Sequence, residues 1–246
     1  MTDPGTSPLP IPGAGGPMGR RIALRRIGRL LAVLAVLGIG AAAALAEHIP
    51  VSGPIDDEAF YRLVACAAPP GGECQKPFVR WPYERALGIT VGITRIDDTI
   101  GQERAAGAQA ALVHAIDQIN RSGARVWLRN TADRPDIQVL LLDIPKRSVL
   151  SGTGVDGLDG NRIDAAHVHV WWNGRREITR GAIVISNGVT RNAMMSTMLE
   201  EVYQALGLMT DIDHPYYSRT SIVAQVGTTQ TTPGRQDLMA LRRHYP

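Results

Sequence analysis

The chain has 246 residues, of which 44% are hydrophobic and 20% are charged. This composition is typical of a globular protein and excludes a disordered, collagen-like or polytopic membrane protein. The formal charge is +3, but the first 46 residues hold five of the 26 basic residues and one of the 23 acidic residues. Residues 47–246 therefore keep 21 basic and 22 acidic residues, a net charge of −1. This balance predicts no nucleic-acid partner.

Residues 1–46 have the pattern of an N-terminal extension with an export signal. Five arginines lie within residues 20–29, and an apolar run follows over residues 30–43. Ala44-Leu45-Ala46 then has the small-x-small pattern of a signal-peptide cleavage site. The leader predicts a periplasmic or secreted protein that begins at Glu47. The alternative is a retained membrane anchor facing outside the cytoplasm, although residues 30–46 would span only about 25 Å as a helix, against roughly 30 Å of hydrocarbon core.

Residues 47–80 form a segment that contains both cysteines of the chain. Cys66 and Cys74 flank a run rich in proline and glycine, which predicts a tight turn between them. In an oxidising compartment we expect the two to form a disulfide that fixes a local hairpin. A metal-binding pair and two unpaired thiols are the alternatives.

Residues 81–246 have the hydrophobic periodicity of one α+β domain. Runs of β-branched and apolar residues, and apolar positions at helical spacing, define its elements. Asp97 or Asp98 is expected to cap the first helix, and Gly207 is expected to end the second. The expected strands are 87–93, 125–129, 137–143, 165–172 and 182–186; the expected helices are 102–120, one from residue 187 or 190 to Gly207, and a short one at 236–243.

This β-α-β-β-β-β-α order resembles the zincin metallopeptidases, in which the second long helix carries H-E-x-x-H. The corresponding stretch here is Glu200-Glu201-Val-Tyr-Gln204-Ala-Leu-Gly-Leu. With the closing His244-Tyr245-Pro246, it resembles the exported bacterial family catalogued as domain of unknown function 2927, whose pattern is E-E-x-x-Q-x-L-G-L-x-N-D. The resemblance covers residues 81–246. It implies a zincin-like mixed sheet and an exported location, but no reaction.

In a zincin, histidines at positions i and i+4 share one helix face and bind one Zn²⁺, while the glutamate polarises a water. The resemblance places Glu200 and Gln204 at the histidine positions and Thr210 at the third ligand position, and keeps the general base as Glu201. Because Zn²⁺ prefers nitrogen and sulfur donors, we expect no conventional zinc site. Binding of another divalent cation that accepts oxygen donors is the alternative. Asp211 matches the aspartate of the family pattern and joins the candidate cation or cleft residues.

Three histidines are further candidates for the same cleft. His167 and His169 alternate with valines, so both imidazoles point to one face of their strand. If that strand is the fourth of a zincin-like sheet, it lies at the edge, and the two rings would line a groove with Glu201. His214 follows the Leu-Gly-Leu turn and is a candidate to reach the same site; solvent-facing roles are the alternative for all three.

Three functions are compatible with these patterns. The leading hypothesis is an exported binding or envelope-associated module with a protein or peptide partner, on a scaffold without conventional zinc peptidase chemistry. The second is a metal-dependent hydrolase or peptidase with Glu201 as the catalytic general base and an atypical ligand set. The third is an accessory subunit anchored in the membrane through a retained leader.

Overall fold

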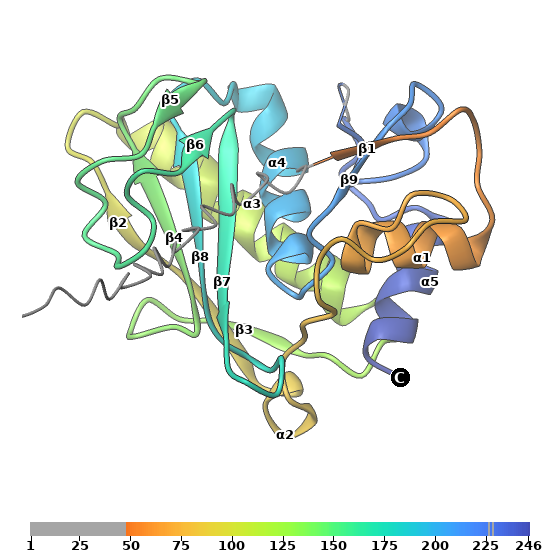
Figure 1. The fold of residues 1–246 in the computed structure, drawn as a ribbon. Helices are drawn as coiled ribbons and strands as arrows, with labels where there is room; N and C mark the ends of the chain where they lie inside the picture. Colours follow the sequence, from red (N-terminus) through yellow and green to blue (C-terminus); the bar gives the residue numbers. More distant parts are fainter. Residues whose placement is uncertain (1–47, 226, 228) are drawn as a thin grey trace, which may run out of the picture. The chain divides into compact units, whose positions relative to one another are not determined.

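The computed structural model describes residues 48–225, 227 and 229–246 (Figure 1). The expected export leader and its alternative as an anchor lie outside these residues. No helix of the described part is long and apolar enough to cross a bilayer.

The strands are β1 (His48–Pro50), β2 (Ile89–Ile96), β3 (Leu128–Asn130), β4 (Ile137–Leu142), β5 (Ser148–Val149), β6 (Arg162–Ile163), β7 (Ala166–Trp172), β8 (Ile178–Ser186) and β9 (Asp211–Asp213). The helices are α1 (Asp57–Cys66), α2 (Tyr83–Ala86), α3 (Gln102–Asn120), α4 (Arg191–Gln204), α5 (Arg235–His244) and a 3-10 turn, η1 (Tyr217–Arg219).

A five-stranded mixed sheet in the order β3-β2-β4-β8-β7 forms the centre of the fold. The strands from β3 to β8 pair in parallel, and β7 pairs antiparallel to β8 at one edge. The β7–β8 connection is a hairpin around Asn173, whose Oδ1 accepts hydrogen bonds from the backbone N–H groups of Arg175 and Glu177. A mixed sheet with several helices is compatible with the α+β class expected from the sequence.

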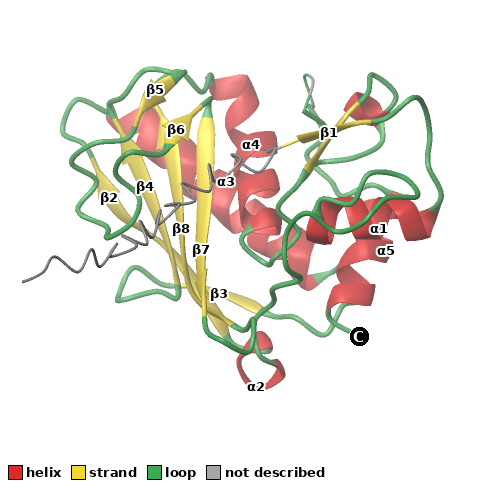
Figure 2. Cartoon of the chain, in the orientation of Figure 1, coloured by secondary structure: helices red, strands yellow, loops and turns green. Residues whose placement is uncertain are grey.

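Each face of the sheet is covered by a different layer (Figure 2). Because successive side chains of a strand point to opposite faces, Ile183 and Ile185 pack into the large core that includes α3 and α4. Ala182 and Val184 pack on the other face, against residues 143–165 and the small β5–β6 ribbon. The side chain of each strand residue is therefore assigned to one of two separate environments.

The N-terminal segment belongs to the same packed body as the rest of the described chain. Phe60, Leu63 and Val64 of α1 are fully buried in the main core. Helix α1 packs on α5, and β1 pairs in parallel with β9, so the first described elements lie against the C-terminal part of the chain. Residues 48–80 therefore pack against the part of the chain that follows them.

The expected disulfide is confirmed. Cys66 and Cys74 are bonded, with their Cα atoms 5.1 Å apart. Helix α1 ends at Cys66, and the backbone N–H groups of Gln75 and Lys76 each donate to the Cys66 carbonyl at 3.0 Å. The bridge therefore closes a local hairpin against the end of α1.

Candidate functional site

Helix α4 carries the residues that the resemblance marked. It begins after Thr190, whose hydroxyl accepts a hydrogen bond from the Ala193 N–H, so one of the two expected starting points is confirmed. It is held in place by apolar side chains such as Met198 and Val202, which are fully buried. Gly207 follows the helix with a φ of +102°, and a Cβ there would lie 2.1 Å from the Val79 carbonyl oxygen. Only glycine fits, and the turn sends the chain back toward β9.

Four of the expected site residues meet on this side of the molecule. Gln204 donates its amide Nε2 to Asp211 Oδ1 at 2.6 Å, which joins the end of α4 to β9. Glu201 is buried, with 7% of its surface exposed. The pKa of Glu200 is raised well above its usual value by burial and then by the nearby carboxylates of Asp211 and Glu201. The candidate residues of α4 and β9 therefore form a polar cluster that is buried at Glu201 and Gln204 and partly exposed at Glu200 and Asp211.

Asp237 of α5 extends this cluster and was not singled out from the sequence. Its carboxylate accepts hydrogen bonds from the Ser221 hydroxyl at 2.6 Å and from the backbone N–H groups of Ile222 and Gly234. Burial raises its pKa to about 6. The available signal was its place as the third residue of an amphipathic helix, where a carboxylate reaches back to the backbone of the capping residue. Its hydrogen bonds to Ser221 and Ile222 attach the segment after η1 to α5.

The strand histidines do not line a groove with Glu201. His167 lies opposite Val184 in the β7–β8 register, and His169 lies opposite Ala182. Both partners belong to the face covered by residues 143–165, whereas the helices cover the other face. The expectation that both rings share a face is confirmed, but that face is the one away from α4, because the alternating valines pack toward the helices.

The two imidazoles lie beside each other and beside Trp171 on that face. The His169 ring lies 4.5 Å from the ring of Trp171 and 6.3 Å from that of His167. Burial, and then the neighbouring His169, lower the pKa of His167 to about 4. The expected role of His214 at the α4 site is also not supported by its contacts, since its Nδ1 accepts a local hydrogen bond from the Tyr216 N–H.

The donor set does not fit a zincin zinc ion. The positions expected to bind it hold a carboxylate at Glu200, an amide at Gln204 that is hydrogen-bonded to Asp211, and a hydroxyl at Thr210. Among residues 48–225, 227 and 229–246, no three or more histidine, cysteine, aspartate or glutamate side chains are grouped so that they could hold a metal ion. We therefore derive no chemical step through a metal.

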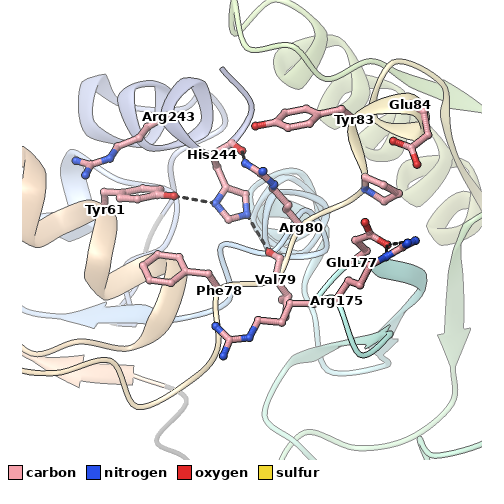
Figure 3. Close-up of a pocket in the computed structure, with 12 residues that line it drawn as sticks. Tyr61, Phe78, Val79, Arg80, Tyr83, Glu84, Arg175, Glu177, Arg243 and His244 are labelled. Atoms are coloured by element: carbon pink, nitrogen blue, oxygen red, sulfur yellow. Dashed lines mark hydrogen bonds and ion pairs between the residues drawn. The ribbon is translucent and has the colours of Figure 1, made fainter.

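A separate pocket of about 630 Å³ opens between α1, α5 and the β7–β8 hairpin (Figure 3). Its walls include Tyr61, Phe78, Arg80, Tyr83 and Arg176. The full lining comes from four separate parts of the chain, at residues 61, 78–84, 175–177 and 243–244, so no local motif marked the pocket.

His244 forms the back of the pocket and is held by both ring nitrogens. Its Nε2–H donates to the Val79 carbonyl at 2.9 Å, and its Nδ1 accepts from the Tyr61 hydroxyl at 3.2 Å (Figure 3). Burial lowers the pKa of His244 to about 4, so the ring is neutral at neutral pH. It shapes the wall of the pocket without adding charge to it.

In comparisons with known proteins, the chain matches no protein-family model, and no curated protein matches its sequence significantly.

Proposed function

We propose that this chain is an exported peptide-binding module on a zincin-like scaffold, in which the edge strand β7 receives an extended peptide. The sheet order supports the scaffold: β7 is the fourth of the five sheet strands in sequence and lies at the edge, antiparallel to its neighbour. Helix α3 follows the first sheet strand and α4 follows the last. This is the arrangement that the resemblance to zincins implies.

The observation that carries the proposal is the unpaired edge of β7, the last strand of the five-stranded sheet. Ser186 donates its N–H to the Ala165 carbonyl, and Gly181 donates its N–H toward β4, to the Asp136 carbonyl. Since backbone groups alternate in direction along an antiparallel strand, those of Ala166, Val168 and Val170 face away from β8. No backbone hydrogen bond within the described part of the chain uses them. An extended peptide that pairs with them would add a sixth strand.

The polar cluster on α4 supports binding over hydrolysis. A general base must reach a water or a substrate, and Glu201 is 7% exposed. The Gln204 amide is engaged with Asp211. These contacts connect α4 to β9. They favour a structural role for residues 200–204, which correspond to the zincin H-E-x-x-H motif.

The test removes one outward-facing N–H from β7. Peptides selected from a random library displayed on phage are measured by fluorescence anisotropy against the wild type, Val168→Pro and Val168→Ala. Proline lacks the N–H and is tolerated on edge strands where that group faces outward, so the fold is retained while pairing is blocked. We expect Val168→Pro to weaken binding by about tenfold or more and Val168→Ala to bind like the wild type. Equal binding to the proline variant overturns the proposal.

The hydrolase alternative is tested with the same peptides. They are incubated with the purified chain, with and without added Zn²⁺, Ca²⁺ or Mg²⁺, and analysed by mass spectrometry. Intact peptides agree with a binding module. Cleavage that disappears in Glu201→Gln, with the fold retained, would establish the alternative instead.

A further inference from the structure

The structure assigns a second ligand site to the pocket between α1, α5 and the β7–β8 hairpin: we propose that it binds an organic monocarboxylate with a flat apolar group. This site is separate from the unpaired edge of β7. The inference does not depend on peptide binding there.

The charges of the pocket are only partly balanced. Four arginines and two glutamates line it. Arg175 is neutralised by Glu177 at 2.9 Å, and Arg243 by Glu58, which lies outside the lining. Arg80, Arg176 and Glu84 are left without an ion pair in the described structure. Two cations against one anion leave a single excess positive charge.

Arg80 is held in position at the centre of the pocket. Its guanidinium carbon lies 4.3 Å from the centroid of the Tyr83 ring, and its Nη1 donates to the His244 carbonyl at 3.5 Å. Figure 3 shows its side chain between His244 and Tyr83. A guanidinium that is already oriented loses less conformational freedom when it binds a carboxylate.

Arg176 is fixed to Arg80 through the backbone. The Arg80 N–H donates to the Arg176 carbonyl at 3.3 Å, and the Ile178 N–H donates to the Arg80 carbonyl at 2.8 Å. The two unpaired arginines therefore project from adjacent, mutually bonded backbone positions. Guanidinium groups bind carboxylates through paired, charge-assisted hydrogen bonds.

The remaining walls favour a flat apolar group on the ligand. Tyr61 and Phe78 have ring centroids 5.9 Å apart, and Tyr83 is 47% exposed at the rim. A volume of about 630 Å³ is in the usual range for small-molecule pockets. The single excess charge favours a monoanion over a phosphate dianion. Benzoate combines the expected charge and shape.

The test uses the full chain and titrates benzoate by calorimetry, with phenylphosphate, inorganic phosphate and benzamidine as comparison ligands. We expect benzoate to bind more tightly than either phosphate compound, and benzamidine, a cation of similar shape, not to bind. Phenylphosphate binding more tightly than benzoate overturns the monocarboxylate assignment. Inorganic phosphate binding as tightly as benzoate overturns the role of the aromatic walls.

Two variants identify the site. Arg176 has a φ of +62°, a conformation that glycine adopts without strain, so Arg176→Gly removes the guanidinium and preserves the turn. Arg147 has a φ of +60° and is also exposed, so Arg147→Gly makes the same change outside the pocket. We expect about a tenfold or greater loss of benzoate affinity in Arg176→Gly and in Arg80→Ala, and none in Arg147→Gly. Wild-type affinity in Arg176→Gly, or equal losses in both glycine variants, overturns the proposal.

Discussion

At the scale of single residues, a substitution at Glu201 distinguishes a structural from a catalytic role of α4. The residue is 7% exposed, and a buried carboxylate costs free energy unless neighbouring groups compensate its charge. Glu201→Gln removes that charge with little change in shape. We expect the free energy of unfolding to fall by on the order of 3 to 5 kcal/mol, seen as a lower melting temperature. An unchanged melting curve would contradict this and favour a general base, which contributes roughly 10²- to 10⁴-fold in rate.

The neighbouring Glu200 provides a matched variant with the opposite expectation. Its pKa is raised by burial and by Asp211, so its charged form destabilises the folded state. An acid with a raised pKa stabilises the fold at low pH, and this contribution is lost as the pH rises through the raised value. Glu200→Gln resembles the protonated acid and should gain stability relative to the wild type from about pH 5 to about pH 8. Urea unfolding at the two pH values tests this, and a loss at the higher pH contradicts it.

His244 predicts an acid-sensitive contact between α5 and the pocket wall. Its pKa is lowered to about 4 by burial, below the usual value of about 6.5. Because the unfolded chain takes up this proton first, the contribution of His244 to stability is present above about pH 6.5 and is lost as the pH falls through about 4. NMR titration of the ring should give a midpoint near 4. A midpoint near 6.5 would mean that the ring is not buried in solution as it is in the structure.

The β7–β8 hairpin contains a typical turn sequence and one residue in a strained backbone conformation. The Asn173-Gly174 dipeptide favours a hairpin turn, and Asn173 organises this turn through its side chain. The left-handed residue, however, is Arg176 rather than a glycine. Arg176→Gly should leave the free energy of unfolding unchanged or raise it by up to about 1 kcal/mol, because strain is relieved while unfolded-state entropy increases. Chemical denaturation measures this, and a clear loss of stability would show that the side chain supports the hairpin.

At the scale of an element, we also predict that Cys66 and Cys74 are oxidised together in the mature protein. Cys66 ends α1, and its bond to Cys74 closes the following turn. Neither thiol of the mature protein should react with an alkylating reagent under denaturing conditions until a reductant is added. Labelling of both before reduction would contradict an oxidised pair.

Element boundaries were predictable where the signal was local. The apolar stripe of α3 gave residues 102–120, and the helix has those bounds. Its cap is Gly101 instead of Asp97 or Asp98; Asp97 accepts hydrogen bonds from Arg95 and from the Asp143 N–H. Strand β8 begins at Ile178, earlier than the expected residue 182. The first residues of β8 include polar side chains and join the sheet because they pair with β7. Intrinsic strand propensity does not include the effect of such a partner strand.

One prediction at the scale of the whole molecule concerns the leader. Ala44-Leu45-Ala46 predicts cleavage before Glu47, which is one residue before the described part begins. Intact-mass measurement on envelope and secreted fractions should find a chain that starts at Glu47. A mass that retains residues 18–46 would instead support the anchored accessory subunit.

The sequence by itself determined what depends on neighbours along the chain: the period of α3, two candidate starts of α4 at residues 187 and 190, the hairpin after β7 and the Cys66–Cys74 pair. Tertiary structure decided the rest. Alternation placed His167 and His169 on one face, but the covering layers decided that this face lies away from Glu201. The packing of α1 on α5 and the pocket around Arg80 likewise join segments far apart in sequence. Strand order and layer packing depend on long-range burial, which periodicity does not specify.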